Sequence, residues 1–243
     1  MRHFGIIGYP LGHSFSPAYF NDKFKKEAIS DAEYGSFPLE DISELKELIN
    51  DHPEIKGLNV TIPYKEKVIP YLDHLESFAE VIGAVNTIKV TNGRLIGFNT
   101  DVGGFIKAIQ PKLKPHHKNA LILGSGGSSK AVKAGLDVLG MYFNVVSRSH
   151  DKGDLIYEKL KTSVIKEHEL IINTTPLGMF PNIDTSPEIP YDELTSKHLC
   201  FDLVYNPFKT EFLKRAEAAG AKCFNGHDML IGQAELSWKI WNA

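Results

Sequence analysis

Strand-like and helix-like runs alternate along almost the whole chain, and this alternation constrains the fold more than any other feature of the sequence. Short apolar runs predict strands at residues 4–8, 33–39, 57–63, 84–90, 94–100, 119–123, 142–147, 169–175, 198–206 and 221–225. Helical patterns fall between most of them, as expected when neighbouring strands are parallel and each crossover carries a helix. The sequence therefore predicts an α/β fold with mainly parallel sheets and helices on both faces.

The alternation falls into two successive units. In the first unit, Asn92-Gly93 between two strand-like runs is a strong hairpin signal and adds an antiparallel pair. Asp41, with Glu44 three residues later, forms a capping box that is expected to open a helix. The polar segment 112–119, KLKPHHKN, contains a proline and is expected to be the boundary loop before the second unit.

The bulk composition excludes several classes of protein. A formal net charge of −3 without a long run of either sign argues against a nucleic-acid footprint and against a polybasic membrane surface. No apolar stretch approaches the ~18 residues of a spanning helix. The N-terminal residues run directly into a strand pattern and do not resemble a signal peptide. We expect a cytoplasmic protein that binds small molecules.

The cysteines and the paired histidines suggest structural roles. Cys200 and Cys223 show neither CxxC spacing nor a disulfide framework, so both are expected to be reduced and mostly buried. His116 and His117 are adjacent in the boundary loop, where neighbouring side chains do not converge on one ion. We expect solvated histidines there and no metal site.

The segment LILGSGGSSKAV, residues 121–132, is the strongest local motif. A strand enters Gly124, and Gly126 and Gly127 open a helix. Glycines at such a turn let the backbone approach a pyrophosphate, which the helix N-terminus stabilises. Ser129 occupies the third glycine position of the dinucleotide fingerprint, so a plain glycine turn is the alternative.

The charge of the residues at the end of the next strand predicts which nucleotide binds. An acidic residue there accepts the 2′-hydroxyl of NAD, whereas a basic residue accommodates the 2′-phosphate of NADP. Here the strand ends in Ser147-Arg148-Ser149, and the first carboxylate is Asp151. An arginine between two hydroxyls suits a phosphate dianion, and we expect NADP. The alternative is a solvated arginine in a turn.

Polar side chains also follow the predicted strands of the first unit. The segments NVTIPYK, AVNT and GFNTD supply a set of amides, hydroxyls, one amine and one carboxylate: Asn59, Thr61, Lys65, Asn86, Asn99, Thr100 and Asp101. Strand ends of an open α/β sheet are where ligands bind. Each residue alone is more often a turn or cap residue, and Asp101 could simply cap the following helix. Together they predict a polar pocket in which Lys65 and Asp101 could move a proton.

These motifs resemble those of the shikimate dehydrogenase family. The segments GYPLGHSFSP, NVTIPYK, GAVNT, GFNTD, GSGGSSKA, NTTPLGM, DLVYNP and NGHDMLIGQA occur in the family's order and at its spacings, over nearly the whole chain. The resemblance implies NADPH-dependent reduction of 3-dehydroshikimate to shikimate. It also implies an N-terminal α/β substrate domain, residues 1–102 with 227–243, and a Rossmann-type NADP domain, residues 103–226.

The resemblance further implies roles for individual residues, with Lys65 and Asp101 as the catalytic pair. The substrate residues that it implies are Ser14, Ser16, Asn59, Thr61, Asn86, Tyr205 and Gln233, with the two serines holding the substrate carboxylate. The expected cofactor residues are Gly124, Ser125, Gly126, Gly127, Ser128, Ser147, Arg148, Ser149, Lys152 and Gly226. Because Gln233 lies on the last predicted helix, that helix is expected to return to the first domain or to line the cleft.

Two departures from the family pattern stand out. Phe20 occupies a position where the family often has histidine, which is expected to affect packing rather than chemistry. Ser147-Arg148-Ser149 replaces the family's Asn-Arg-Thr, and Lys152 is the nearby second cation in place of an arginine. Two rival functions remain: a quinate/shikimate dehydrogenase using NAD, and a nucleotide-binding regulatory protein without catalysis. The expected assembly is a monomer or a homodimer.

Overall fold

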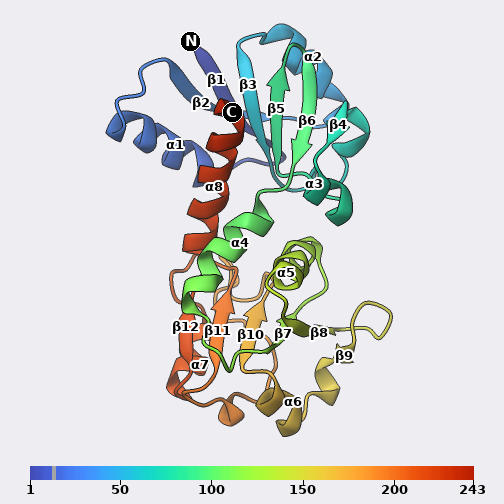
Figure 1. The fold of residues 1–243 in the computed structure, drawn as a ribbon, viewed down its shortest axis with the longest axis vertical. Helices are drawn as coiled ribbons and strands as arrows, with labels where there is room; N and C mark the ends of the chain where they lie inside the picture. Colours follow the sequence, from blue (N-terminus) through green and yellow to red (C-terminus); the bar gives the residue numbers. More distant parts are fainter. Residues whose placement is uncertain (13–14) are drawn as a thin grey trace. The chain divides into compact units, whose positions relative to one another are not determined.

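The structure is a computed structural model that describes residues 1–12 and 15–243. The chain divides into two compact units, one formed by Met1–Thr100 with Ala234–Ala243 and the other by Asp101–Gln233. The boundaries implied by the family resemblance, 102/103 and 226/227, lie close to the first of these divisions and seven residues before the second. The loop 112–119, expected from its composition to separate the units, lies inside the second unit instead, because α4 (Asp101–Ile109) already belongs to that unit. Figure 1 shows the path of the chain through both units.

The first unit contains a six-stranded sheet in the order β2-β1-β3-β5-β6-β4. Its strands are β1 (Arg2–Gly8), β2 (Ala32–Pro38), β3 (Ile55–Val60), β4 (His74–Leu75), β5 (Thr87–Thr91) and β6 (Arg94–Phe98). β1 is parallel to β2 and β3, whereas β5 is antiparallel to β3 and β6. Asn92 and Gly93 both have positive φ, as a two-residue hairpin turn requires, so the predicted hairpin is confirmed.

The helices of the first unit are α1 (Phe15–Lys26), α2 (Leu45–Asp51), α3 (Ser77–Ile82) and the C-terminal part of α8 (His227–Asn242). The capping box of Asp41 and Glu44 is present, and it opens a short 3-10 turn that leads into α2. α1 and α8 cover Phe4 and Ile6 on one face of the sheet, and α2 and α3 cover Ile7 on the other.

The second unit contains a six-stranded sheet in the order β12-β11-β10-β7-β8-β9, with every pairing parallel. Its strands are β7 (Asn119–Leu123), β8 (Tyr142–Ser147), β9 (Leu155–Ile156), β10 (Leu170–Asn173), β11 (Leu199–Asp202) and β12 (Lys222–Phe224). Figure 1 shows β10 and β11 pointing the same way. The prediction of an α/β fold with mainly parallel sheets is confirmed.

Helices cover both faces of the second sheet, as predicted. The helices are α4 (Asp101–Ile109), α5 (Gly127–Val138), α6 (Thr162–Glu167) and α7 (Glu211–Ala218). Ala120 and Ile122 of β7 pack with residues of α4 and α5, whereas Leu121 and Leu123 pack with residues of α6 and α7. Successive side chains of a strand point to opposite faces, so β7 is apolar on both sides.

The expectation of solvated histidines in the boundary loop is wrong for His117. Its side chain is buried, its Nδ1 accepts the Lys114 N–H at 3.0 Å, and its Nε2 lies 3.1 Å from the carbonyl oxygen of Lys197. Burial lowers the pKa of this imidazole. The ring therefore fastens the loop to the residues before β11 instead of facing water. Cys200 is buried, Cys223 is partly buried, and both are free thiols.

The C-terminal end of α8 is fixed to the first sheet by Trp241. The indole N–H of Trp241 donates to the carbonyl oxygen of Ile88 at 2.9 Å, and its ring stacks on Phe4 with centroids 5.0 Å apart. Gly57 of β3 makes room for this ring, because a Cβ at that position would lie 2.2 Å from Trp241 Cδ1 and Nε1.

We predict that Gly57→Ala destabilises the protein, since the added methyl group displaces the Trp241 ring and breaks its hydrogen bond. Overpacking of this kind costs about 1–3 kcal/mol, measurable as a lower Tm in thermal denaturation. Gly35→Ala in β2 is the matched control, because its Cβ would come no closer than 3.7 Å to Phe37. Equal melting temperatures for the two variants would contradict this account.

Candidate active site

A buried cluster of amides and hydroxyls lies in the first unit, where β3, β5 and β6 meet the C-terminal part of α8. Asn59 of β3 is its centre. The Asn59 amide donates to Ser237 Oγ at 3.0 Å and to Thr87 Oγ1 at 3.3 Å, and its carbonyl oxygen accepts the Tyr34 hydroxyl at 2.7 Å. All four side chains are buried. The cluster is therefore a polar network held inside the unit.

Asn86 extends this network to the segment that follows β6. Its side-chain oxygen accepts the Thr100 N–H at 2.7 Å, and its amide donates to Thr100 Oγ1 at 3.0 Å. Thr87 Oγ1 lies 2.7 Å from Ser237 Oγ, which ties β5 to α8. Asn59 and Asn86, predicted separately from the sequence, thus belong to one connected set, while Thr61 is only partly buried just beyond β3.

The serine loop between β1 and α1 is described in part. Ser14 lies outside the described residues. Ser16, the second residue of α1, is buried and hydrogen bonded with Tyr34. Burial raises the pKa of Tyr34 well above its ordinary value, although the hydrogen bond with Ser16 opposes the shift. Tyr34 thus links Ser16 to Asn59. Phe20 is fully buried and stacks on Tyr34 with centroids 4.5 Å apart, which is a packing role.

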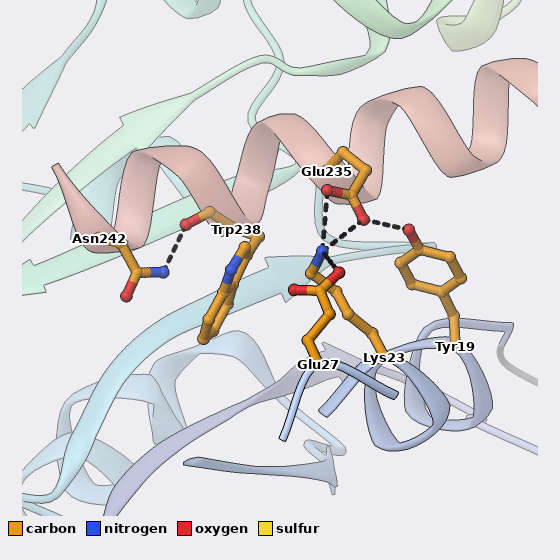
Figure 2. Close-up of polar contacts among 6 residues, drawn as sticks. All are labelled: Tyr19, Lys23, Glu27, Glu235, Trp238 and Asn242. Atoms are coloured by element: carbon orange, nitrogen blue, oxygen red, sulfur yellow. Dashed lines mark hydrogen bonds and ion pairs between the residues drawn. The ribbon is translucent and has the colours of Figure 1, made fainter. Parts of the chain in front are cut away.

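The helix that carries Ser16 is attached to α8 by a group of charged side chains (Figure 2). The Lys23 ammonium lies 2.7 Å from Glu27 Oε1 and 3.0 Å from Glu235 Oε2, and its side chain is only 8% exposed. The Tyr19 hydroxyl donates to Glu235 as well, and burial together with this contact raises the pKa of Tyr19. The Lys23 ammonium therefore bridges Glu27, directly after α1, and Glu235 of α8, and it joins the two helices.

The two expected catalytic residues, Lys65 and Asp101, belong to different units. Lys65 is partly buried on the turn after β3, and its carbonyl oxygen accepts the Val85 N–H at 2.7 Å. Asp101 is the first residue of α4 and is partly buried. Gln233 is buried on α8. A Cβ at Gly104 would lie 2.9 Å from the Gln233 backbone nitrogen, so α8 approaches α4 closely one turn after Asp101.

The remaining residues expected at the substrate and cofactor sites lie near the ends of β11 and β12. Tyr205 follows β11 and is 36% exposed. Gly226 is buried, and a Cβ there would lie 2.2 Å from the Leu203 carbonyl oxygen. Gly226 therefore lets two backbone segments pack closely, which no side chain would permit.

The glycine turn between β7 and α5 forms an open cradle. Gly124 has a φ of +105°, and a Cβ there would lie 2.8 Å from Thr175 Cγ2. Gly126 is the N-cap of α5, and no side chain of the described residues caps it. A Cβ at Gly126 or Gly127 would meet no described atom within 4 Å. The first turn of α5 can therefore receive a pyrophosphate, and a dinucleotide fits this cradle.

A pocket of about 460 Å³ adjoins the cradle within the second unit. It is lined by Gly124, Ser125, Gly126, Ser147, Arg148, Ser149, Lys152, Tyr157, Thr174, Thr175, Pro176 and Leu177. Ser125 Oγ lies 3.1 Å from Ser147 Oγ, and the Ser149 N–H donates to Ser147 Oγ at 3.4 Å. The pocket thus gathers the expected cofactor residues except Gly127 and Ser128, which follow on α5, and Gly226.

Several residues of these sites were not predicted. Tyr34, Thr87 and Ser237 belong to the polar network, and Tyr157 and 174–177 line the pocket. The position of Ser237, four residues after Gln233 on a predicted helix, would have placed both on one face. The segment 174–177 spans the end of the strand-like run 169–175, and the ends of parallel strands are where ligands bind.

Asp202 stabilises the backbone next to the pocket through a chain of hydrogen bonds. It ends β11 fully buried, where its carboxylate accepts the Asn173 amide at 2.9 Å, the Val204 N–H at 3.0 Å and the Thr210 hydroxyl. Asn173 in turn accepts the Thr175 N–H at 3.0 Å. Burial raises the pKa of Asp202 to about 6, although its hydrogen bonds oppose the shift.

Comparison with known proteins identifies the family. The family model described as the shikimate dehydrogenase substrate binding domain matches residues 6–88. A shikimate dehydrogenase (NADP(+)) of Desulforamulus reducens is 37% identical over 259 residues, which cover 98% of this chain and 88% of the relative. The chain belongs to the shikimate dehydrogenase family.

Two further members of the shikimate dehydrogenase family extend the match. A shikimate dehydrogenase (NADP(+)) of Methanosphaera stadtmanae is 39% identical, covering 98% of this chain and 90% of the relative. The crystal structure of the Thermus thermophilus enzyme in complex with NADP(H) and shikimate is 31% identical, with a TM-score of 0.87 over 99% of this chain and 93% of the other. The family's two-unit fold is therefore retained over the whole length of the chain.

A metal site requires several ligating side chains close together, and a membrane-spanning helix requires length and apolar character. Within residues 1–12 and 15–243, no group of three or more histidine, cysteine or acidic side chains could hold a metal ion. Over the same residues, none of the helices has the length and apolar character needed to span a membrane.

We predict that Asp202 makes stability depend on pH. Its pKa is about 6 in the folded protein and ordinary in the unfolded chain, so its contribution is fully present below about pH 4 and is lost as pH rises through 6. Two pKa units correspond to about 3 kcal/mol. Asp202→Asn keeps the acceptor for Asn173 and Val204 but cannot ionise. Urea unfolding from pH 4 to 7 should show wild type losing stability relative to the variant. Parallel pH curves would contradict the shift.

Proposed function

We propose that this protein catalyses the NADPH-dependent reduction of 3-dehydroshikimate to shikimate, an oxidoreductase step toward chorismate and the aromatic amino acids. The observation that carries the proposal is the relationship to NADP-dependent shikimate dehydrogenases over 98% of the chain. The glycine cradle, with Arg148 at the end of the neighbouring strand, supports the cofactor. Lys65 and Asp101 support catalysis, which argues against a regulatory protein that has lost it.

The substrate is a carboxylated ring with several hydroxyl groups, and amides and hydroxyls are the groups that bind such a ring. We assign the carboxylate to Ser14 and Ser16, with Tyr205 nearby. The ring hydroxyls are assigned to the amide and hydroxyl side chains Asn59, Thr61, Asn86 and Gln233. The bonds of Asn59 to the Ser237 hydroxyl and of Asn86 to the Thr100 hydroxyl and N–H support this assignment, because they fix the orientation of both amides before substrate arrives.

The reaction needs a hydride at the carbonyl carbon and a proton at its oxygen. When bound, NADPH supplies the hydride. We assign the proton transfer to Lys65 and Asp101 acting as a pair, in which Lys65 stabilises the charge developing on the oxygen and the pair passes it a proton. The hydrogen bond from Val85 to the Lys65 carbonyl supports this role by anchoring the backbone of the turn.

The cofactor preference rests on charge. A 2′-phosphate carries nearly two negative charges, and Arg148 offers a planar fork of donors for it. Ser147, Ser149 and Lys152 add donors in the same pocket. Residues 147–149 contain no carboxylate to accept the 2′-hydroxyl of NAD, which argues against an NAD-dependent quinate/shikimate dehydrogenase. We place the enzyme in the cytoplasm, as a monomer or a homodimer.

Lys65→Ala is expected to lower turnover by roughly 10²–10⁴-fold, the range for a positioned acid/base group. The Michaelis constant for shikimate should change much less. Steady-state kinetics with shikimate and NADP measures both quantities. Lys67→Ala, two residues later and exposed, is the matched control and should leave turnover unchanged. Near-normal turnover in Lys65→Ala would remove this residue from the mechanism.

Arg148→Ala is expected to weaken NADP(H) selectively, because the lost charge-assisted contact is worth about 1.5–3 kcal/mol, or one to two decades in affinity. NAD(H) use should stay almost unchanged. Kinetics with both cofactors on wild type and variant decides the point, and exposed Arg94→Ala serves as the control. A variant that still prefers NADP would assign the preference to Lys152 or another cation.

A further inference from the structure

Tyr157 occupies the edge of the sheet where the expected 2′-phosphate residues lie. The short strand β9 pairs in parallel with β8, with Val146 opposite Leu155 and Ser147 opposite Ile156. Tyr157 follows β9 directly as the first residue of a 3-10 turn, just as Arg148 follows β8 directly. Tyr157 also lines the pocket that contains Arg148 and Lys152. The position therefore follows from the pairing of β9, a strand of two residues with no clear sequence signal.

The buried hydroxyl of Tyr157 is unusual in this protein. Within residues 1–12 and 15–243, it is the one buried side-chain nitrogen or oxygen atom without a hydrogen-bond partner. The hydroxyl of Tyr191, by contrast, donates to the Pro187 carbonyl at 2.8 Å. A buried hydroxyl without a partner is destabilising, so such a group in a native structure has a reason.

The surroundings of this hydroxyl favour an anionic partner. Burial raises the pKa of Tyr157 to about 12, against the opposing effect of the nearby Arg148 charge, so the phenol stays protonated and can donate at neutral pH. The pocket also holds the Lys152 ammonium and the hydroxyls of Ser147 and Ser149. The Asp151 carboxylate interacts with Ser149 and Lys152, but it is not among the residues that line the pocket. The lining itself supplies cations and O–H donors, which is the chemistry that binds a phosphate.

We propose that the Tyr157 hydroxyl donates a hydrogen bond to the 2′-phosphate of NADP(H) and contributes to the preference for the phosphorylated cofactor. The inference rests on the proposed NADP site and adds to it a donor from outside the strand-end segment Ser147–Ser149. The hydroxyl is shielded from solvent, so the proposal requires the side chains that cover it to move when the phosphate enters. Arg148 and Lys152 line the same pocket and are exposed.

The test is Tyr157→Phe, studied by calorimetric titration with adenosine 2′,5′-bisphosphate and with adenosine 5′-monophosphate. We expect the variant to lose about one to two decades in affinity for the bisphosphate, the worth of one hydrogen bond to a charged group. Its affinity for the monophosphate should not change. Its Tm should equal or exceed that of wild type, because phenylalanine removes a hydroxyl that has no partner.

Tyr191→Phe is the matched control, since it deletes the hydroxyl of a buried tyrosine in the same unit that does have a partner. This variant should melt at a lower temperature and bind both nucleotides normally. Unchanged bisphosphate affinity in Tyr157→Phe, or an equal loss for both nucleotides, would overturn the assignment.

The failure of this inference is separable from failure of the proposed cofactor preference. Suppose that wild type prefers the bisphosphate and that Arg148→Ala abolishes this preference. If Tyr157→Phe then retains the preference, only the role of Tyr157 is wrong. If wild type binds both nucleotides equally, the pocket does not recognise a 2′-phosphate, and both proposals are wrong.

Discussion

The parallel pairing of β7 with β8 and β10 is the constraint on which the nucleotide pocket depends. Leu123 lies in register with Val146 on one side and with Asn173 on the other, so these strands end at one edge of the sheet. The glycine turn, the segment Ser147–Ser149 and Thr174 therefore emerge beside one another. Each would be an ordinary turn residue if its strand ended elsewhere, because none has a ligand-binding geometry of its own.

Buried polar groups then hold these strand ends in place. In the second unit, Asp202 and Asn173 join the ends of β11 and β10 and support the backbone of Thr175. In the first unit, Asn59 plays a similar part by joining Tyr34, Thr87 and Ser237. Side-chain amides and carboxylates are costly to bury, but they become rigid supports when every lone pair and N–H is satisfied.

Some buried polar atoms have hydrogen-bond partners within the protein and stabilise the fold, whereas one has no such partner in the part of the chain that the structure describes and is able to bind a ligand. Asp202 bonds to several neighbours and therefore acts as a structural member of its unit. The Tyr157 hydroxyl is also buried, but it lacks a partner among the described residues. A donor kept in the pocket without an internal acceptor is available for a ligand at no cost in existing bonds.

Much of the fold was predictable because it rests on local patterns. The long strands, the Asn92-Gly93 hairpin and the Asp41 capping box follow from periodicity and turn chemistry, and the structure confirms them. The two-residue strands β4 and β9 were missed, because two residues are too few to show an alternation. His117 was wrongly expected to be solvated, since burial of a loop histidine depends on which distant backbone lies above it.

The sequence by itself determined the class of fold, the glycine turn after β7 and the cation at the end of β8, since each depends on neighbours within a few residues. It also carried the motifs that place the chain in its family. Only the tertiary structure decided which polar residues meet. Ser237 reaches Asn59 across 178 positions, and Tyr157, just after a two-residue strand without a pattern, lines the same pocket as Arg148. Such meetings depend on strand order and register, which no short stretch of sequence encodes.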